Sequence, residues 1–376
     1  MNLGIYIHIP FCHRRCTYCD FYLTTNLNLL DNFVDALIRE IELYANKYSD
    51  RIVDTIFFGG GTPSIVSSNQ FKKVIDALYK NFNIIDSPEI TIECNPEDII
   101  GDENKFSEFS KIGVNRLSVG VQSFIDNELK FLTRQHNAND AIKSLKISKK
   151  YFNNVSADII YSFNEQELFD VKYNLKKIIQ LDLQHISAYT LILEKGTLLY
   201  KEYEQKNLLE SIDNDNPLFY DFVNTMLKEN GYRHYEVSNY AKEGFQSKHN
   251  LKYWNFDDYL GLGPSAHSFI KDKRFMNVKS VSKYTDKLNK GILPVDSSEI
   301  LTTKRLKNDY FISVFRSNGV ILGKYNKLFG SVFLIDYKDI IDRLLNLNLA
   351  ELNNDRFYLT EKGFALADEI TLVFLS

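Results

Sequence analysis

The stretch GIYIHIPFCHRRCTYCDFY, residues 4–22, is the part of the sequence that decides the fold. It holds three of the four cysteines, Cys12, Cys16 and Cys19, in the spacing C-x3-C-x2-C. Isoleucines at positions 5, 7 and 9 lead into it, and this alternation stops at Pro10. An apolar alternation that stops at a proline predicts a β-strand. We therefore expect three thiols on a tight loop at the C-terminal end of a first strand.

Three cysteines in this spacing suit an iron–sulfur cluster. A cubane cluster has four irons, so three cysteines leave one iron open to a small molecule that brings its own amine and carboxylate. Zinc is the alternative, but structural zinc sites use four protein ligands and paired C-x2-C knuckles, and no second pair follows here. Cys94 lies far along the chain in an apolar strand pattern. The sequence favours a cluster, with zinc or plain thiols as alternatives.

Composition indicates one large globular domain with room for a smaller one. Of the 376 residues, 44% are hydrophobic, and the formal net charge of −4 gives no case for a nucleic-acid partner. No signal peptide is expected, and no stretch approaches the ~20 apolar residues of a membrane-spanning helix. Clustered cysteines fit a reducing compartment, so we expect a cytoplasmic protein.

Strand and helix patterns alternate from the first strand to about residue 231. Further strands are expected at 55–58, 89–94, 116–121, 155–161 and 185–191. Helices are expected at 30–41, 71–82, 106–112, 140–150, 168–179 and 217–231, with Ser67 or Ser68 capping the second and Asn216 the last. Such alternation predicts an α/β fold with parallel strands and right-handed crossovers. Functional side chains are then expected at the C-terminal ends of the strands.

From about Leu301 the pattern changes to short helices and a hairpin. Helices are expected at 310–315, 325–329 and 337–344, strands at 349–352 and 356–359, and a last helix capped by Thr360. This order is winged-helix-like, so we expect two domains, 1–300 and a small α+β domain at 301–376. The second contains 10 Lys and Arg against 9 Asp and Glu, which argues against DNA binding. A lid or packing role is preferred, and a DNA-binding regulator is a distant alternative.

The cysteine spacing, with the aromatic Tyr18 directly before the third cysteine, resembles the signature of the radical S-adenosylmethionine (radical SAM) superfamily. The sequence YIHIPFC, residues 6–12, narrows the resemblance to the group around oxygen-independent coproporphyrinogen III oxidase. The resemblance implies an incomplete (β/α)6 TIM-like barrel that is open on one side. It also implies a 4Fe–4S cluster whose open iron chelates S-adenosylmethionine. One electron, from a donor such as a flavodoxin or ferredoxin, would then release a 5′-deoxyadenosyl radical.

The run GGGTP, residues 59–63, ends the second expected strand. Glycines there allow a backbone to approach a ligand closely and to offer its N–H groups. A glycine run alone is more often a simple turn. In the family that this chain resembles, the run holds the amino group and methionine part of S-adenosylmethionine, which implies contacts from Gly60, Gly61 and Thr62.

Further cofactor contacts are implied near the ends of the later strands. Glu93, in IECNP, is expected to accept hydrogen bonds from the cofactor's amine or ribose, with a structural ion pair as the alternative. Arg134, in LTRQH, is expected near the methionine carboxylate, with a surface arginine as the alternative. The same resemblance implies cofactor contacts from Tyr6, Tyr18, Gln122, Asp158 and Ala188.

The segment HNLKYW, residues 249–254, holds the only tryptophan. A histidine beside Tyr and Trp can bind a haem iron while the rings stack on the macrocycle, and an aromatic core corner is the alternative. The pattern HNxxYW resembles a motif of the HemW-type haem chaperones in this group. It makes His249 the candidate haem contact, with His8, His13 and His267 as weaker ones.

Two departures separate the neighbouring families. The oxidases usually carry a further cysteine two places after the third, where this chain has Phe21, and an extension ahead of the first strand. Both differences favour the chaperones. We therefore expect a protein that binds a cluster, S-adenosylmethionine and haem and passes haem to respiratory haemoproteins at the cytoplasmic membrane, with enzyme activity left open. The alternative is radical oxidative decarboxylation of the propionates of coproporphyrinogen III.

Overall fold

The computed structural model, which describes residues 2–163, 166–208 and 217–375, contains six parallel strands paired in chain order. They are β1 (Leu3–Ile9), β2 (Ile52–Gly60), β3 (Asn83–Cys94), β4 (Arg116–Gln122), β5 (Val155–Tyr161) and β6 (His185–Thr190). All six expected strands are confirmed, although β2 and β3 begin earlier than their apolar patterns. The parallel strands with helices between them are those of a partial barrel.

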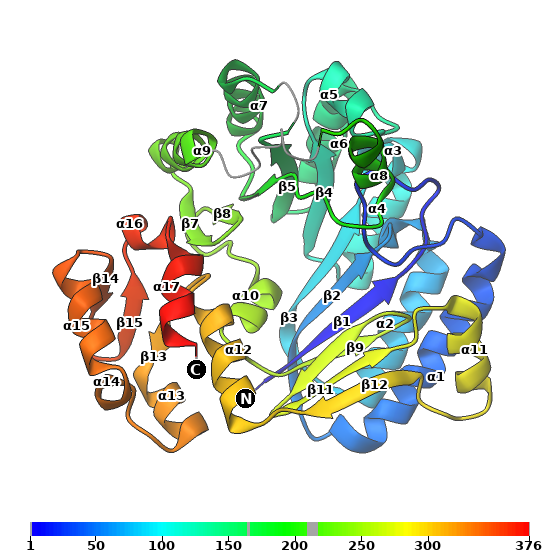
Figure 1. Ribbon diagram of the computed structural model, residues 1–376. Coiled ribbons are helices and arrows are strands. Elements are labelled where there is room, and N and C mark those ends of the chain that lie inside the picture. The colour runs from blue at the N-terminus through cyan, green and yellow to red at the C-terminus, as the bar shows by residue number, and fades with distance from the viewer. Residues whose placement is uncertain (1, 164–165, 209–216, 376) are drawn as a thin grey trace.

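Helices connect these strands, and α1, α2, α4 and α6 line one face of the sheet (Figure 1). The helices are α1 (Leu30–Tyr48), α2 (Ser68–Asn81), α3 (Pro96–Gly101), α4 (Glu103–Ile112), α5 (Asp126–Phe131), α6 (Ala138–Tyr151), α7 (Leu168–Gln180), α8 (Leu198–Gln205) and α9 (Pro217–Glu229). Ser67 caps α2 in a capping box with Gln70, as one of the two serines was expected to. The cap predicted at Asn216 lies outside the described residues.

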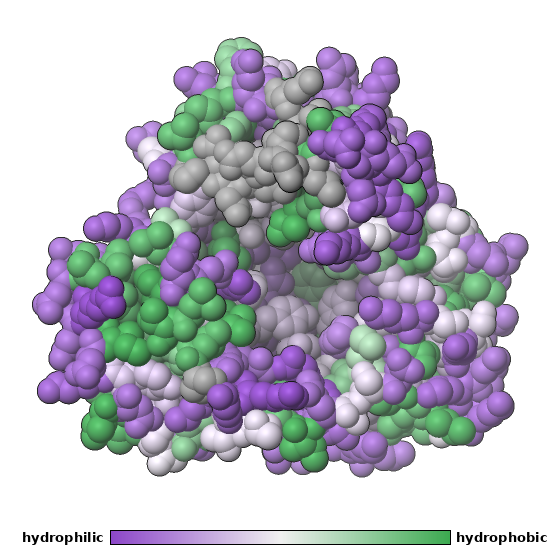
Figure 2. All heavy atoms as spheres, in the orientation of Figure 1, coloured by the Kyte–Doolittle hydropathy of each residue, from purple (hydrophilic) through white to green (hydrophobic). Residues whose placement is uncertain are grey.

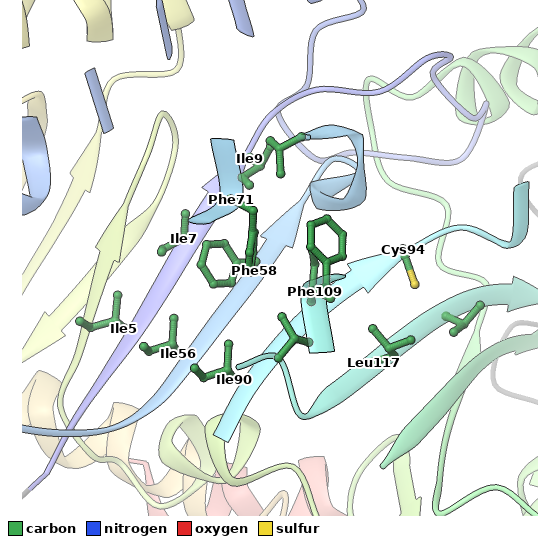
Figure 3. Packing of buried hydrophobic residues seen from close by; sticks show 14 of the residues in the cluster. Ile5, Ile7, Ile9, Ile56, Phe58, Phe71, Ile90, Cys94, Phe109 and Leu117 are labelled. Atoms are coloured by element: carbon green, nitrogen blue, oxygen red, sulfur yellow. The ribbon is translucent and has the colours of Figure 1, made fainter. Parts of the chain in front are cut away.

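Alternation along β1 separates a core face from an inner face. The isoleucines at positions 5, 7 and 9 are buried against the helix layer, close to Phe58 of β2 and Phe71 of α2 (Figure 3). The rings of these two phenylalanines lie 4.6 Å apart. Successive side chains leave opposite faces of a strand, so Tyr6 and His8 point to the inner, concave face. That inner face carries the polar residues of the candidate functional site described below.

Both edges of the parallel sheet are extended. Beyond β1 lie β9 (Tyr259–Leu262), which is parallel to it, and the antiparallel β10 (His267–Ile270), β11 (Lys273–Asn277) and β12 (Val295–Ile300). Beyond β6 lie the antiparallel β8 (Asn239–Ala241) and β7 (Arg233–Glu236). The described residues thus form one twelve-stranded sheet, with α10 (Lys248–Trp254) and α11 (Val281–Asn289) in its connections. The sequence did not predict these six strands, because most are too short to show a period.

The last part of the chain builds a second core around a small sheet of β13 (Val320–Ile321), β15 (Arg356–Leu359) and β14 (Ala350–Leu352). Its helices are α12 (Thr303–Val314), α13 (Leu322–Phe329), α14 (Phe333–Asp336), α15 (Lys338–Asn346), α16 (Glu361–Phe364) and α17 (Ala367–Phe374). Thr360 caps a helix, as expected, but this helix is the short α16, and a separate α17 follows where one last helix was expected. Phe256 and Phe269 also belong to this core, which therefore reaches back across residue 301. The division into two domains stays a prediction.

Among the described residues, no helix is both long enough and apolar enough to cross a membrane.

Candidate functional site

The cysteine loop follows β1 and lies directly against the glycine run at the end of β2. The N–H of Gly61 donates to Ile9 O at 2.9 Å, and that of Thr62 donates to Phe11 O at 2.7 Å. A Cβ atom on Gly61 would lie 2.6 Å from Phe11 O, so only glycine permits this approach of two backbones. Gly60, with φ +106°, donates to Glu93 Oε2 at 3.1 Å. These N–H groups are bonded within the protein, contrary to our expectation that they would be offered to a ligand.

The three loop thiols form no disulfide and face different neighbours. Cys12 is buried, with its Sγ 3.3 Å from Thr62 Oγ1, and burial raises its pKa to about 11. Cys16 Sγ accepts a hydrogen bond from Arg134 Nη1 at 3.6 Å, and burial raises the pKa of Cys19. Among the described residues, no three His, Cys, Asp or Glu side chains converge as one metal ion requires. Each of three thiols on one loop can bind a different iron of a cubane cluster, whereas a structural zinc site uses four protein ligands.

Arg134 joins the cysteine loop to the ends of β3 and β4. Besides Cys16 Sγ, its guanidinium donates to Gly120 O at 2.9 Å and to Asn95 Oδ1. Asn95 in turn donates to Thr62 Oγ1 at 3.1 Å. The alternative of a surface arginine does not hold, because these bonds fix the guanidinium inside the site.

Two half-buried carboxyl groups, those of Glu93 and Asp158, lie on the inner face, on β3 and β5. Burial, together with the nearby Asp158, raises the pKa of Glu93 to about 8. Burial also raises the pKa of Asp158, which accepts a hydrogen bond from Ser118 Oγ at 3.2 Å. Asp158 lies in the middle of β5 rather than at its end, where we expected it. Among the described residues Glu93 forms no ion pair, and its Oε2 accepts a hydrogen bond from the N–H of Gly60.

The other implied cofactor contacts are distributed over the same interior. Tyr6 OH lies 3.1 Å from His8 Nδ1 on the inner face of β1. Gln122 ends β4 in a left-handed conformation with φ 68°. Ala188 is buried within β6, and its N–H already donates to Ser238 O at 2.8 Å. Burial raises the pKa of Tyr18, beside Arg134. The structure thus places these residues on the same interior as Glu93 and Asp158.

His249, our candidate haem contact, is fully buried. Its Nδ1 lies 2.9 Å from Thr55 Oγ1 and its Nε2 lies 2.9 Å from Tyr253 OH, so both ring nitrogens are hydrogen bonded. Burial lowers its pKa to about 3. The HNxxYW segment therefore forms an aromatic core corner, which was the alternative interpretation. The spacing i, i+4 explains the pair with Tyr253, because both residues lie on one face of α10.

A half-open cleft of about 300 Å³ lies between the inner face of β9–β11 and helix α12. Its lining includes Tyr253, Tyr259, His267, Arg274 and Asp309. Figure 2 shows this side of the molecule hollowed at its centre, between the C-terminal elements on the left and the strands β9, β11 and β12 on the lower right. Sequence reasoning missed Arg274 and Asp309, because the residues of the cleft come from separate short elements and share no motif.

Comparisons with known proteins address the family. A model of the radical SAM superfamily matches residues 6–175. "Heme chaperone HemW" of Buchnera aphidicola subsp. Schizaphis graminum is 33% identical over 99% of this chain and 98% of its own. "Heme chaperone HemW" of Bacillus subtilis is 32% identical over 98% of each chain. The mitochondrial "Radical S-adenosyl methionine domain-containing protein 1" of Danio rerio is 34% identical, over 71% of this chain and 60% of its own.

Among solved structures, coproporphyrinogen III oxidase (HemN) from Escherichia coli superposes with a TM-score of 0.84. The match covers 100% of this chain and 90% of that one. At 22% identity it shows a shared fold, and together with the family match over residues 6–175 it confirms the expected partial barrel. The chain belongs to the radical SAM superfamily and, within it, to the HemW heme chaperone family.

Proposed function

We propose that this protein is a haem chaperone, which binds haem and passes it to other haemoproteins. The observation that carries the proposal is the likeness to proteins named heme chaperone HemW over nearly the full length of both chains. A match confined to the barrel would support only the cofactor chemistry, and not the haem chaperone function. The full-length match includes the sheet extension and the C-terminal elements, where the cleft lies.

Membership of the radical SAM superfamily implies a 4Fe–4S cluster and S-adenosylmethionine. We propose Cys12, Cys16 and Cys19 as the protein ligands of three irons, with the fourth left for the cofactor. When bound, the reduced cluster supplies one electron for cleavage of the sulfonium. Our proposed cofactor contacts are Tyr6, Tyr18, Gly60, Gly61, Thr62, Glu93, Gln122, Arg134, Asp158 and Ala188.

The protein's own side chains suggest how an amino acid cofactor would be held. An ammonium group only donates hydrogen bonds, so it would bind oxygen acceptors such as those of Glu93 rather than the N–H groups of Gly60, Gly61 and Thr62. The guanidinium of Arg134 offers a fixed cation for a carboxylate, close to Cys16. Both inferences agree with the network that links the glycine run, β3 and the cysteine loop.

The remaining partners are proposals from family membership. Recipient haemoproteins at the cytoplasmic membrane, an electron donor such as a flavodoxin or ferredoxin, and a cytoplasmic location all stay predictions. Cell fractionation, and capture of haem from the loaded protein by membrane-bound apo-cytochromes, are the measurements that address them.

The test of the proposed function is a haem titration of anaerobically reconstituted protein, followed by transfer to an apo-haemoprotein. We expect saturable binding of about one haem per chain, and loss of that haem to the acceptor. A protein that binds no haem, or that binds it without release to any acceptor, would contradict the proposal.

Coproporphyrinogen III oxidase activity is the second candidate, supported by the shared barrel alone. Phe21 stands where those oxidases usually carry a further cysteine, which weakens this candidate. Incubation of the reconstituted protein with coproporphyrinogen III, reductant and S-adenosylmethionine separates the two. Formation of protoporphyrinogen would establish the oxidase, and its absence alongside haem binding would leave the chaperone.

A further inference from the structure

The hydrogen bonds of the histidine rings restrict which of them can bind a haem iron. The chain has seven histidines, all within the described residues. Five have ring nitrogens bonded to protein groups: His8, His136, His185, His234 and His249. For the two others, His13 and His267, no ring hydrogen bond is found within the described ranges 2–163, 166–208 and 217–375.

These two histidines have different surroundings. His13 lies on the exposed part of the cysteine loop, beside a pocket of only about 20 Å³ that also includes Cys16 and Arg134. His267 lies at the start of β10 and lines the 300 Å³ cleft. Ligand pockets for small molecules are usually about 300 to 1,000 Å³, so only the second has room for part of a macrocycle.

Strand register places His267 on the inner face of the sheet together with aromatic rings. Phe269 of β10 pairs with Tyr259 of β9, and Met276 of β11 pairs with His267. The ring of Tyr259 meets that of Tyr253 edge-to-face, with centroids 4.6 Å apart. Side chains two residues apart share a face of a strand, so these rings and the imidazole line one wall. A flat apolar macrocycle packs favourably on such a wall.

A cation completes the cleft on its solvent side. Arg274 of β11 is paired with Phe269 in register and forms an ion pair with Asp309 of α12. Its side chain is 40% exposed, and a guanidinium has five N–H donors, so donors remain for a second carboxylate. Arginine binds carboxylates through two parallel hydrogen bonds. Haem carries two propionates on one edge, and one of them can pair with Arg274.

We propose that haem binds in this cleft, with His267 as the iron ligand, Arg274 paired with a propionate, and Tyr253 and Tyr259 against the macrocycle. The inference rests on the proposed chaperone function and locates its haem site. One edge of the porphyrin would occupy the cleft, while the remainder would lie across its open side. His249 is then a positioning residue, because it holds Tyr253 through its Nε2.

Two protonation states agree with this assignment. Partial desolvation, followed by the nearby Lys279 and Arg274, lowers the pKa of His267 and so favours the neutral imidazole that binds iron. Burial raises the pKa of Tyr253 well above its usual value, so Tyr253 is not a tyrosinate ligand at that pH.

The experiment is a haem titration of anaerobically reconstituted wild-type protein and His267→Ala, with His13→Ala as the matched control. Difference spectra are taken against the same protein without haem. We expect at least a tenfold weaker affinity and a shifted Soret band for His267→Ala, and no change for His13→Ala. Added imidazole should restore the Soret position of His267→Ala, which a merely unfolded variant would not show. Unchanged binding and spectrum in His267→Ala would overturn the proposal.

Haem dimethyl ester, which lacks free carboxylates, tests the role of Arg274. Arg274→Gln should weaken haem binding several-fold and leave binding of the ester at the wild-type level. Arg305→Gln is the matched control, because this arginine of α12 pairs with Glu299 and does not line the cleft, and it should leave haem binding at the wild-type level. Equal affinity of Arg274→Gln and the wild type for haem would contradict the carboxylate pairing.

The two proposals fail differently in these titrations. If the wild-type protein binds no haem, the chaperone function itself is wrong, and the haem site with it. If the wild type binds haem and His267→Ala binds it identically, only the site is wrong. His249→Gln separates positioning from ligation, because it should weaken haem binding without moving the Soret band of the haem that does bind.

Discussion

The cysteine loop and the cleft between β9–β11 and α12 are built in opposite ways. The loop is one short stretch of sequence, and backbone hydrogen bonds from Cys12, Gly61 and Thr62 tie it to its neighbours. The cleft collects side chains from five elements, α10, β9, β10, β11 and α12, none of which contributes more than a few residues. A cluster site can thus be predicted from the spacing of its cysteines. A site for a large flat ligand depends on how separate elements pack together.

The same contrast appears between the two sequence motifs, the cysteine loop and the HNxxYW segment. Cys12 is placed by a motif and faces the predicted site, next to Thr62. His249 is also placed by a motif, but its ring is enclosed by Thr55 and Tyr253. A motif identifies residues that matter to the protein. It does not distinguish a residue that contacts a ligand from one that holds such a residue in place.

The largest expected effect is loss of the iron–sulfur cluster, and it concerns the cysteine loop alone. Cys12→Ala, Cys16→Ala and Cys19→Ala should each abolish the visible absorbance and iron content of the reconstituted protein, because each removes the ligand of one iron. Cys94→Ala should retain both, since Cys94 is buried in β3 with its thiol directed to Ser118 O. Loss of the cluster in Cys94→Ala, measured by iron content, would show that the ligands are assigned wrongly.

The next effect concerns the cation that joins the loop to the sheet. Arg134→Gln should weaken S-adenosylmethionine binding on the order of tenfold, as expected for loss of charged hydrogen bonds. Equilibrium dialysis of the anaerobic protein measures this, with Lys130→Gln on the exposed side of α5 as the control. The haem spectrum should not change in either variant. If the haem spectrum changed in Arg134→Gln, the cysteine loop and the cleft would share one ligand site.

A smaller effect tests why the glycine run is glycine. Gly61→Ala places a Cβ against Phe11 O and Ile9 O, both backbone atoms that cannot move freely, and should lower the free energy of unfolding by about 1–3 kcal/mol. Gly101→Ala, where nothing lies within 4 Å, should have little effect. Urea denaturation measures both. Equal stability of the two variants would show that the close approach of the backbones is not required.

The smallest effect is the pH dependence of Glu93. In the folded protein its pKa is raised from 4.5 to about 8, so its contribution to stability is full below pH 4.5 and is lost as the pH rises towards 8. Glu93→Gln stays neutral, so its free energy of unfolding should fall less between pH 6 and pH 8. The difference between the two proteins is at most about 1.4 kcal/mol per pH unit. Parallel curves in urea denaturation would contradict the raised pKa, and Glu108→Gln on α4 serves as the control.

Much of the fold could be predicted because its signals are local. The six parallel strands, the cap at Ser67 and the hairpin near residue 355 each depend on a few neighbouring residues. The strands β7 to β12 could not be predicted, because strands of three to six residues that pair across long connections carry little pattern of their own. The position of Asp158 within β5, rather than at its end, was missed for a related reason, since apolar residues continue on both sides of it.

The sequence by itself determined the superfamily and brought together the three proposed cluster ligands, because three thiols within eight residues are held together by the chain whatever the rest of the fold does. Tertiary structure alone decided which histidine is open to a ligand. Hydrogen bonding and burial enclose His249, and the register of β9, β10 and β11 brings His267, Tyr259 and Arg274 to one wall. Accessibility depends on every element that packs around a residue, and no short stretch of sequence contains that information.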